Sequence, residues 1–118
     1  MQVYSDTELN NLLLTMKRKG YSPQECGRLM EMTRQIKEDM QFDIVHFWFI
    51  KRDNSERSAY GTRAPDIIHR YGADPRKDNT PPDEKGLDGT FPYFDLDRKA
   101  WRCFKPECLV KVDKGYTL

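Results

Sequence analysis

The chain has 118 residues and a mass of 14.0 kDa, a size typical of one domain. Its 20 basic and 19 acidic side chains give a formal charge of +1. This balance excludes a chain that is basic over its whole surface and holds nucleic acid by its total charge. Hydrophobic residues make up 37% and aromatic residues 12%, so we expect a compact core with a polar remainder.

The sequence also bears on compartment. No run of about 18 apolar residues is present, so no membrane-spanning helix is expected. The N-terminus lacks the basic start and apolar stretch of a secretory signal, which predicts a cytoplasmic protein. Cys26, Cys103 and Cys108 are an odd number of cysteines in a chain large enough to fold without disulfides, and we expect reduced thiols.

Two amphipathic helices are predicted at the start of the chain. Ser5 and Glu8 form a capping box ahead of leucines at helical spacing, which predicts a helix over roughly 6–18. Ser22 caps a second predicted helix, roughly 23–40, whose apolar residues recur with a period of 3.6. Such a pair is either an ordinary antiparallel helix pair or a DNA-reading helix-turn-helix.

The period then changes to that of strands. Residues 42–50 are rich in β-branched and aromatic side chains and are apolar on both faces, so we expect cover on both sides. His46 lies among them and is predicted to be a hydrogen-bonded core residue. A hairpin connection at 51–57 leads to a second strand at 58–62, where Gly61 marks a bulge or a close packing contact.

The second half of the chain alternates turns and short strands. Residues 65–71 suggest a single helical turn, whereas 72–90 holds only two apolar residues and is not expected to order itself. Three further strands are predicted, through 91–96, 101–104 and 109–112. Five short strands after two helices favour a small closed barrel.

Four motifs in the strand region form a recognisable pattern: Tyr60-Gly61-Thr62, Tyr93-Phe94-Asp95, Trp101-Arg102-Cys103-Phe104-Lys105 and Leu109. Through them, residues 42–113 resemble a bacterial family with an Sm-like SH3 β-barrel, which is related to the WYL domains. The resemblance implies an α+β fold in which an N-terminal helical pair is followed by a small five-stranded SH3-like (Sm-like) β-barrel. The domain organisation it implies is a helical pair at 1–41, a barrel at 42–114 with a polar insertion at 72–90, and a tail at 115–118.

The resemblance also implies a role. WYL domains are regulatory modules that bind nucleic acid or nucleotide-like ligands through a basic surface. That surface includes an arginine of the strand that corresponds to Trp101-Arg102-Cys103-Phe104, and Arg102 is the residue that carries over.

Local charge supports a binding surface at the C-terminal end. Residues 98–114 hold six basic and two acidic residues, a net charge of +4, interleaved with aromatic rings. Cations beside aromatic rings suit the phosphates and stacked bases of a single-stranded nucleic acid, or a nucleotide-like anion. The candidate binding residues are Arg98, Lys99, Arg102 and Lys105, together with Arg63.

Other interpretations of this surface stay open. Trp101 and Phe104 could be core residues, which would make the cations the solvated face of edge strands. The acidic segment 77–97, with a net charge of −4, could also lie over the cations. In the alternative class of function, the chain is a protein-interaction or assembly module that binds a partner or a second copy through edge strands or the helical pair.

Catalytic and metal sites have little support. The cysteines, His46 and His69 lack the paired spacing of a zinc site, and Cys103 lacks any motif of a nucleophile. Asp95 and Asp97 have the spacing of an acid–base pair, yet aspartates beside a hairpin are usually turn formers. No phosphate-binding loop or nucleophile elbow is present. We therefore expect no enzyme activity, no cofactor and no metal.

Overall fold

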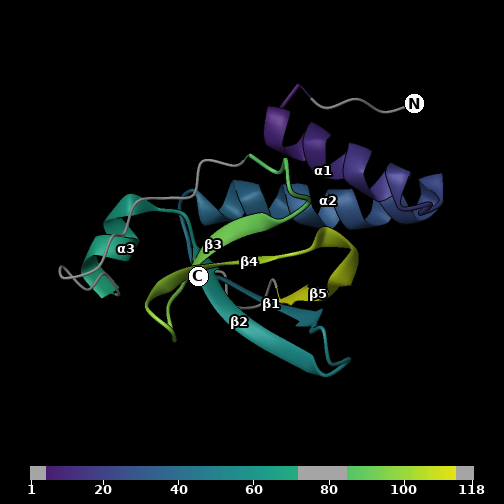
Figure 1. Cartoon of the computed structure of the whole chain (residues 1–118). Helices are drawn as coiled ribbons and strands as arrows, with labels where there is room; N and C mark the ends of the chain where they lie inside the picture. The colour runs from purple at the N-terminus through teal and green to yellow at the C-terminus, as the bar shows by residue number, and fades with distance from the viewer. Residues whose placement is uncertain (1–4, 72–84, 114–118) are drawn as a thin grey trace.

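The computed structural model describes residues 5–71 and 85–113. The elements, in chain order, are α1 (Thr7–Arg18), α2 (Pro23–Met40), β1 (Val45–Ile50), β2 (Glu56–Thr62), α3 (Pro65–Tyr71), β3 (Phe91–Asp95), β4 (Ala100–Phe104), the 3-10 turn η1 (Pro106–Cys108) and β5 (Leu109–Asp113). Two helices followed by a five-stranded sheet confirm the predicted α+β class. Figure 1 shows α1 and α2 across one side of the bent sheet, with α3 set apart at one end.

The strands form one antiparallel sheet in the order β4-β3-β2-β1-β5. Strand β1 lies between β2 and β5, and its Phe47 pairs with Ala59 of β2 on one side and with Val112 of β5 on the other. The register against β5 shifts between Trp48 and Phe49 of β1. Such a bulge bends a strand, and bending lets a short sheet curl into a barrel.

The capping box predicted for α1 is wrong in detail. The N-cap is Asp6, whose carboxylate accepts a hydrogen bond of 3.1 Å from the Leu9 amide. Glu8 instead turns away to bind Arg63 at the end of β2. The cap of α2 is as predicted, since the Ser22 side chain accepts from the backbone amide of Glu25.

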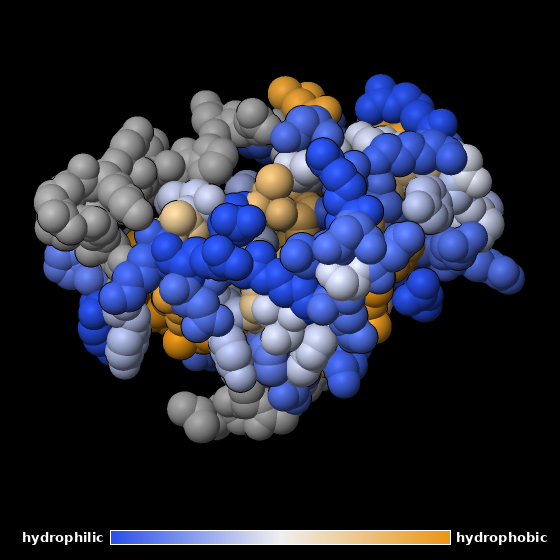
Figure 2. Space-filling view, turned by 60° about the horizontal axis from the view of Figure 1, so that its bottom comes forward, coloured by the Kyte–Doolittle hydropathy of each residue, from blue (hydrophilic) through white to orange (hydrophobic). Residues whose placement is uncertain are grey.

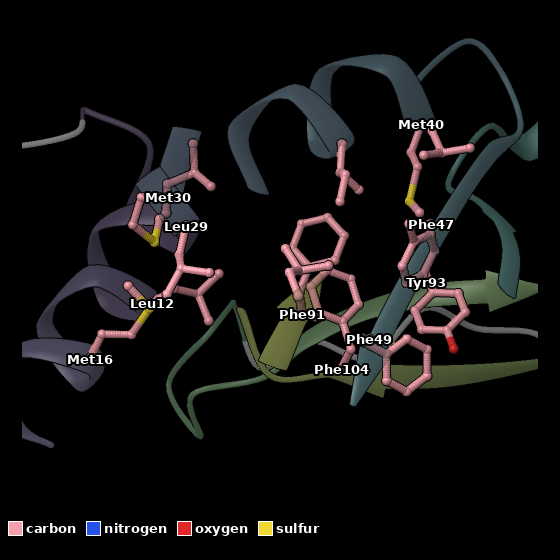
Figure 3. Close-up of a cluster of buried hydrophobic side chains, with 14 of the residues drawn as sticks. Leu12, Met16, Leu29, Met30, Met40, Phe47, Phe49, Phe91, Tyr93 and Phe104 are labelled. Atoms are coloured by element: carbon pink, nitrogen blue, oxygen red, sulfur yellow. The ribbon is translucent and has the colours of Figure 1, made fainter. Parts of the chain in front are cut away.

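One hydrophobic core joins the two helices to the sheet. Figure 3 shows its side chains reaching from both sides: Leu12, Met16, Leu29, Met30, Met40, Phe47, Phe49, Phe91, Tyr93 and Phe104. The rings of Phe47 and Tyr93 are nearly perpendicular, at a centroid distance of 5.1 Å. The division of the chain at residue 41 stays a prediction.

The two faces of β1 are not equally covered, contrary to the prediction. Val45, Phe47 and Phe49 are buried under the helices, but the alternate residues are only half-buried. His46 is one of these, so it lies on the outer face of the sheet rather than in the core. Its ring stacks on that of Tyr60 at a centroid distance of 4.1 Å, and the Trp48 ring lies 4.0 Å away, tilted by 42°.

Gly61 marks a close packing contact, one of the two roles expected for it. A Cβ atom there would lie 2.6 Å from Cδ2 of Tyr93 and 3.1 Å from Cε of Met40. The absence of a side chain thus lets β2 pass directly beneath α2 and the Tyr93 ring.

The polar stretch 72–90 is in part more ordered than expected. Residues 85–90 form turns against α1, and the Asn11 side chain donates a 3.0 Å hydrogen bond to the Lys85 carbonyl. Gly86 and Gly89 have positive φ and pack so closely on α1 that a Cβ atom would contact it at 2.8 Å. Residues 72–84 and the predicted tail lie outside the described residues.

Candidate anion-binding site

A pocket of about 450 Å³ opens where the end of β1 faces β4 and η1. We call it the basic pocket. Its described lining consists of Phe49, Ile50, Lys51, Arg52, Arg57, Thr90, Arg102, Cys103, Phe104, Lys105 and Cys108. Phe49 and Phe104 are buried and form its apolar base, while the cations around it are mostly exposed.

These cations come together because the bent sheet brings β4 close to the end of β1, where Phe49 and Phe104 are 6.3 Å apart between ring centroids. Arg57 lies opposite Phe49 at the start of β2, and its guanidinium carbon is 5.8 Å from the centre of that ring. Arg102 lies opposite Tyr93 on β4. Lys105 precedes η1, so cations that lie far apart in the sequence surround one hollow.

The pocket is strongly positive. Five of its lining side chains are cationic, and none of the described ones is a carboxylate. Arg57 is neutralised by Asp95, with 2.7 Å between Nη2 and Oδ2. Lys51, Arg52, Arg102 and Lys105 form no ion pair with any residue in the described part of the chain.

Asp95 is a structural residue beside the pocket. Its carboxylate is fully buried, binds Arg57, and accepts hydrogen bonds from the backbone amides of Asp97 and Arg98. Asp97 is exposed and contributes its amide to this turn. The pair is therefore a turn-forming device, and the geometry provides no acid–base couple.

Tyr93 of β3 pairs with Arg102 of β4, and its hydroxyl is buried without a hydrogen-bond partner among the described residues. Burial, and next the negative charge of Asp95, raise the pKa of Tyr93 to about 12. The phenol is accordingly neutral at physiological pH.

The predicted binding residues lie in three different places. Arg102 and Lys105 line the basic pocket as exposed cations. Arg98 and Lys99 are exposed on the turn that precedes β4, at the end of that strand away from the pocket. Arg63 donates hydrogen bonds to the Glu8 carboxylate, and its guanidinium carbon lies 3.8 Å from the centre of the Phe91 ring. The structure therefore separates Arg63 from the other four predicted residues.

The aromatic residues of the predicted stripe also separate. Phe104 is a core residue, and Trp101 is half-buried with its ring nearly perpendicular to that of Phe94. The sequence prediction missed Lys51, Arg52 and Arg57, which it had assigned to a hairpin connection. The signal was present, because residues 51–57 hold three cations and only two carboxylates.

Other chemistry is weakly represented. No group of three His, Cys, Asp or Glu side chains that could hold a metal ion occurs in the described ranges. Cys103 and Cys108 are free thiols in the basic pocket. Burial, and next the charge of the nearby Glu107, raise the pKa of Cys108, which disfavours the nucleophilic thiolate.

No helix within residues 5–71 or 85–113 is long and apolar enough to cross a membrane. The acidic segment predicted at 77–97 lies partly outside the described residues.

Comparison with known proteins identifies a family. The model of the family WYL_2, described as an Sm-like SH3 beta-barrel fold, matches residues 33–110. The match spans the second half of α2 and nearly all the strands, including every described residue that lines the basic pocket. No curated protein and no solved structure matches the chain.

Proposed function

Because the chain belongs to the WYL_2 family of Sm-like SH3 β-barrels, we propose that it is a non-catalytic binding module that holds a single-stranded nucleic acid. In this proposal the basic pocket binds phosphate groups of the strand. The observation that carries it is the presence of five cations, and no carboxylate, among the described residues around one hollow.

The physical argument rests on repulsion between like charges. Cations held close together repel one another, and only Arg57 has an anionic partner among the described residues. Bound phosphates would relieve this repulsion and release the counterions that the phosphates carry in solution. The cations come from the β1–β2 hairpin, β4 and the start of η1, a spread that suits several phosphates better than one.

The test compares two double variants with the same change in charge. In the pocket variant, Arg102→Glu and Lys105→Glu place two carboxylates in the basic pocket. In the turn variant, Arg98→Glu and Lys99→Glu make the same change beyond the other end of β4. All four side chains are exposed, so both variants are expected to fold.

Fluorescence anisotropy of a labelled mixed-sequence single strand then measures affinity at several salt concentrations. We expect the pocket variant to raise the Kd at least about tenfold and to lower the salt slope by about 1.4, the amount for two lost single-strand phosphate contacts. The turn variant should change both much less. If both variants lose the same affinity, net charge alone would explain the loss and the basic pocket would not be the site. Unchanged binding in the pocket variant would also refute the proposal.

The length of the ligand is the second measurement. A strand that occupies several cations should bind more tightly as it is lengthened from one nucleotide to about six. If a mononucleotide competes as well as the strand, the ligand is a nucleotide-like anion instead. If the chain is instead an assembly module, the edge strands β4 and β5 are its candidate contact surface. The apolar faces of α1 and α2 are already buried in the core.

A further inference from the structure

A second pocket, of about 510 Å³, lies at the opposite end of β1 from the basic pocket. The segment before β1, the outer face of β2 and one side of α3 enclose it. Its lining includes Phe42, Tyr60, Tyr71, Asp43, Asp66 and Arg70. We call it the aromatic pocket.

The three aromatic side chains are unusually exposed. The exposed fractions are 75% for Phe42, 42% for Tyr60 and 56% for Tyr71. Most of the face drawn in Figure 2 is hydrophilic, with hydrophobic groups only in small separate patches. Large exposed rings gathered around one hollow are typical of surfaces at which proteins make contacts.

The Tyr60 ring is held in place before any ligand binds. One of its faces stacks on His46, with 4.1 Å between centroids and 11° between planes. His46 in turn packs against Trp48, and the Lys111 ammonium lies 4.4 Å from the centre of the Trp48 ring. Because Tyr60 also lines the aromatic pocket, it presents a preorganised ring there.

The charge at this pocket is opposite to that of the basic pocket. Asp43 and Asp66 line it, and neither carboxylate is in an ion pair with another residue of the described segments. Arg70 is the one cation of the described lining, which leaves a net charge of −1. The Arg70 guanidinium carbon is 5.7 Å from the centre of the Tyr71 ring, so a ring of this pocket already faces a guanidinium.

We infer that the aromatic pocket receives an arginine side chain from a partner polypeptide. The apolar stem of the arginine would contact Ile44 and Ile67, which also line the pocket. The planar guanidinium would stack on the Tyr60 ring where it lines the pocket and hydrogen-bond to the Asp43 or Asp66 carboxylate. Arginine fits better than lysine because its flat, delocalised cation both stacks on rings and pairs with carboxylates.

The inference is independent of the proposed nucleic-acid site. Phosphates are disfavoured in the aromatic pocket, since Asp43 and Asp66 would repel them. None of its lining residues is shared with the basic pocket. A chain with both sites would hold an anionic ligand at one end of β1 and a basic protein segment at the other.

The test is an NMR titration of the full chain with the peptide acetyl-Ala-Arg-Ala-amide. Its matched control replaces arginine by citrulline, which has nearly the same shape and no charge. We expect saturable shifts of backbone amide signals near Tyr60 and Ile67 with the arginine peptide and at least fivefold weaker binding of the citrulline peptide. Equal binding of the two peptides, or shifts that arise elsewhere, would overturn the assignment.

Variants locate the site further. Tyr60→Ala, and the double variant Asp43→Asn with Asp66→Asn, should each weaken arginine-peptide binding at least fivefold. The pocket variant with Arg102→Glu and Lys105→Glu should bind the peptide as the unmodified chain does, even if it no longer binds nucleic acid. Peptide binding unaffected by Tyr60→Ala, or self-association of the chain that Tyr60→Ala abolishes, would contradict a separate arginine-bearing partner.

Discussion

Arg63 and Glu8 join the end of β2 to the first turn of α1 through two parallel hydrogen bonds of 2.8 and 2.6 Å. Glu8 is 6% exposed, and its carboxylate also lies 2.9 Å from the ammonium of Lys37 on α2. The Arg63 Nε donates to the Pro92 carbonyl at 2.9 Å. One side chain thus connects the first helix, β2 and β3, which gives it a structural role in place of the ligand-binding role expected from the sequence.

Arg63→Ala is expected to destabilise the protein by about 3 kcal/mol, because it leaves the Glu8 carboxylate buried with a weaker partner and uncovers the Phe91 ring. Urea denaturation followed by circular dichroism measures this loss. Arg34→Ala is the control, since Arg34 makes ion pairs with Glu31 and Glu38 on the exposed face of α2. A change as small as that of the control would show that the Arg63 contacts contribute no more than surface pairs.

The same cluster makes stability depend on acid pH. Burial alone would raise the pKa of Glu8, but the hydrogen bonds and charge of Arg63 and of Lys37 outweigh it and hold the pKa below the usual 4.5. A lowered pKa stabilises the fold above about pH 4.5, and this contribution is lost as the pH falls through the folded-state value. The urea midpoint should therefore drop between pH 6 and pH 3, and the drop should be smaller in Glu8→Gln. An identical pH profile in that variant would contradict the assignment.

Two glycine substitutions are expected to have opposite signs. Gly61→Ala should cost about 1–3 kcal/mol, because its Cβ atom would lie 2.6 Å from the Tyr93 ring inside the core. Gly27→Ala should stabilise by up to about 1 kcal/mol, because Gly27 is exposed within α2 with nothing within 4 Å of the added atom. Thermal unfolding of both variants provides the comparison, and a stabilised Gly61→Ala would mean that β2 and α2 pack less closely than described.

Tyr93→Phe is expected to be neutral or slightly stabilising at pH 7, since it removes a buried hydroxyl that has no hydrogen-bond partner among the described residues. Because burial raises the folded-state pKa of Tyr93 to about 12, the phenol ionises less readily in the folded chain than in the unfolded chain, and stability is lost as the pH rises from about 10 toward 12. The variant should therefore lose less stability than the unmodified chain between pH 9 and pH 11. Marked destabilisation at pH 7 would reveal a polar contact to this hydroxyl.

The secondary structure was largely predictable from the sequence. Helical spacing of the leucines, the Ser22 cap and the β-branched run of β1 act over a few residues, and the structure bears out two helices and five strands near the expected positions. The family was predictable for a similar reason, because its motifs lie on single strands and turns. Local predictions were wrong where a residue distant in the sequence supplied a better partner. Glu8, for example, binds Arg63 instead of completing the predicted capping box.

The grouping of charges was decided by the tertiary structure. Single arginines with uncharged neighbours in the sequence lie in different environments, since Arg63 is neutralised by a carboxylate 55 positions away while Arg102 is exposed in a pocket. Bending of the sheet brings β4, which is separated from β1 by two strands in the order, against the β1–β2 hairpin around one hollow. At the other end of β1, α3 helps to enclose the aromatic pocket. Composition and spacing determined which helices and strands form, because capping, helical periodicity and strand propensity act between residues close in the sequence. Which cations share a pocket depends on long-range pairing and burial, and these exist only once the chain has folded.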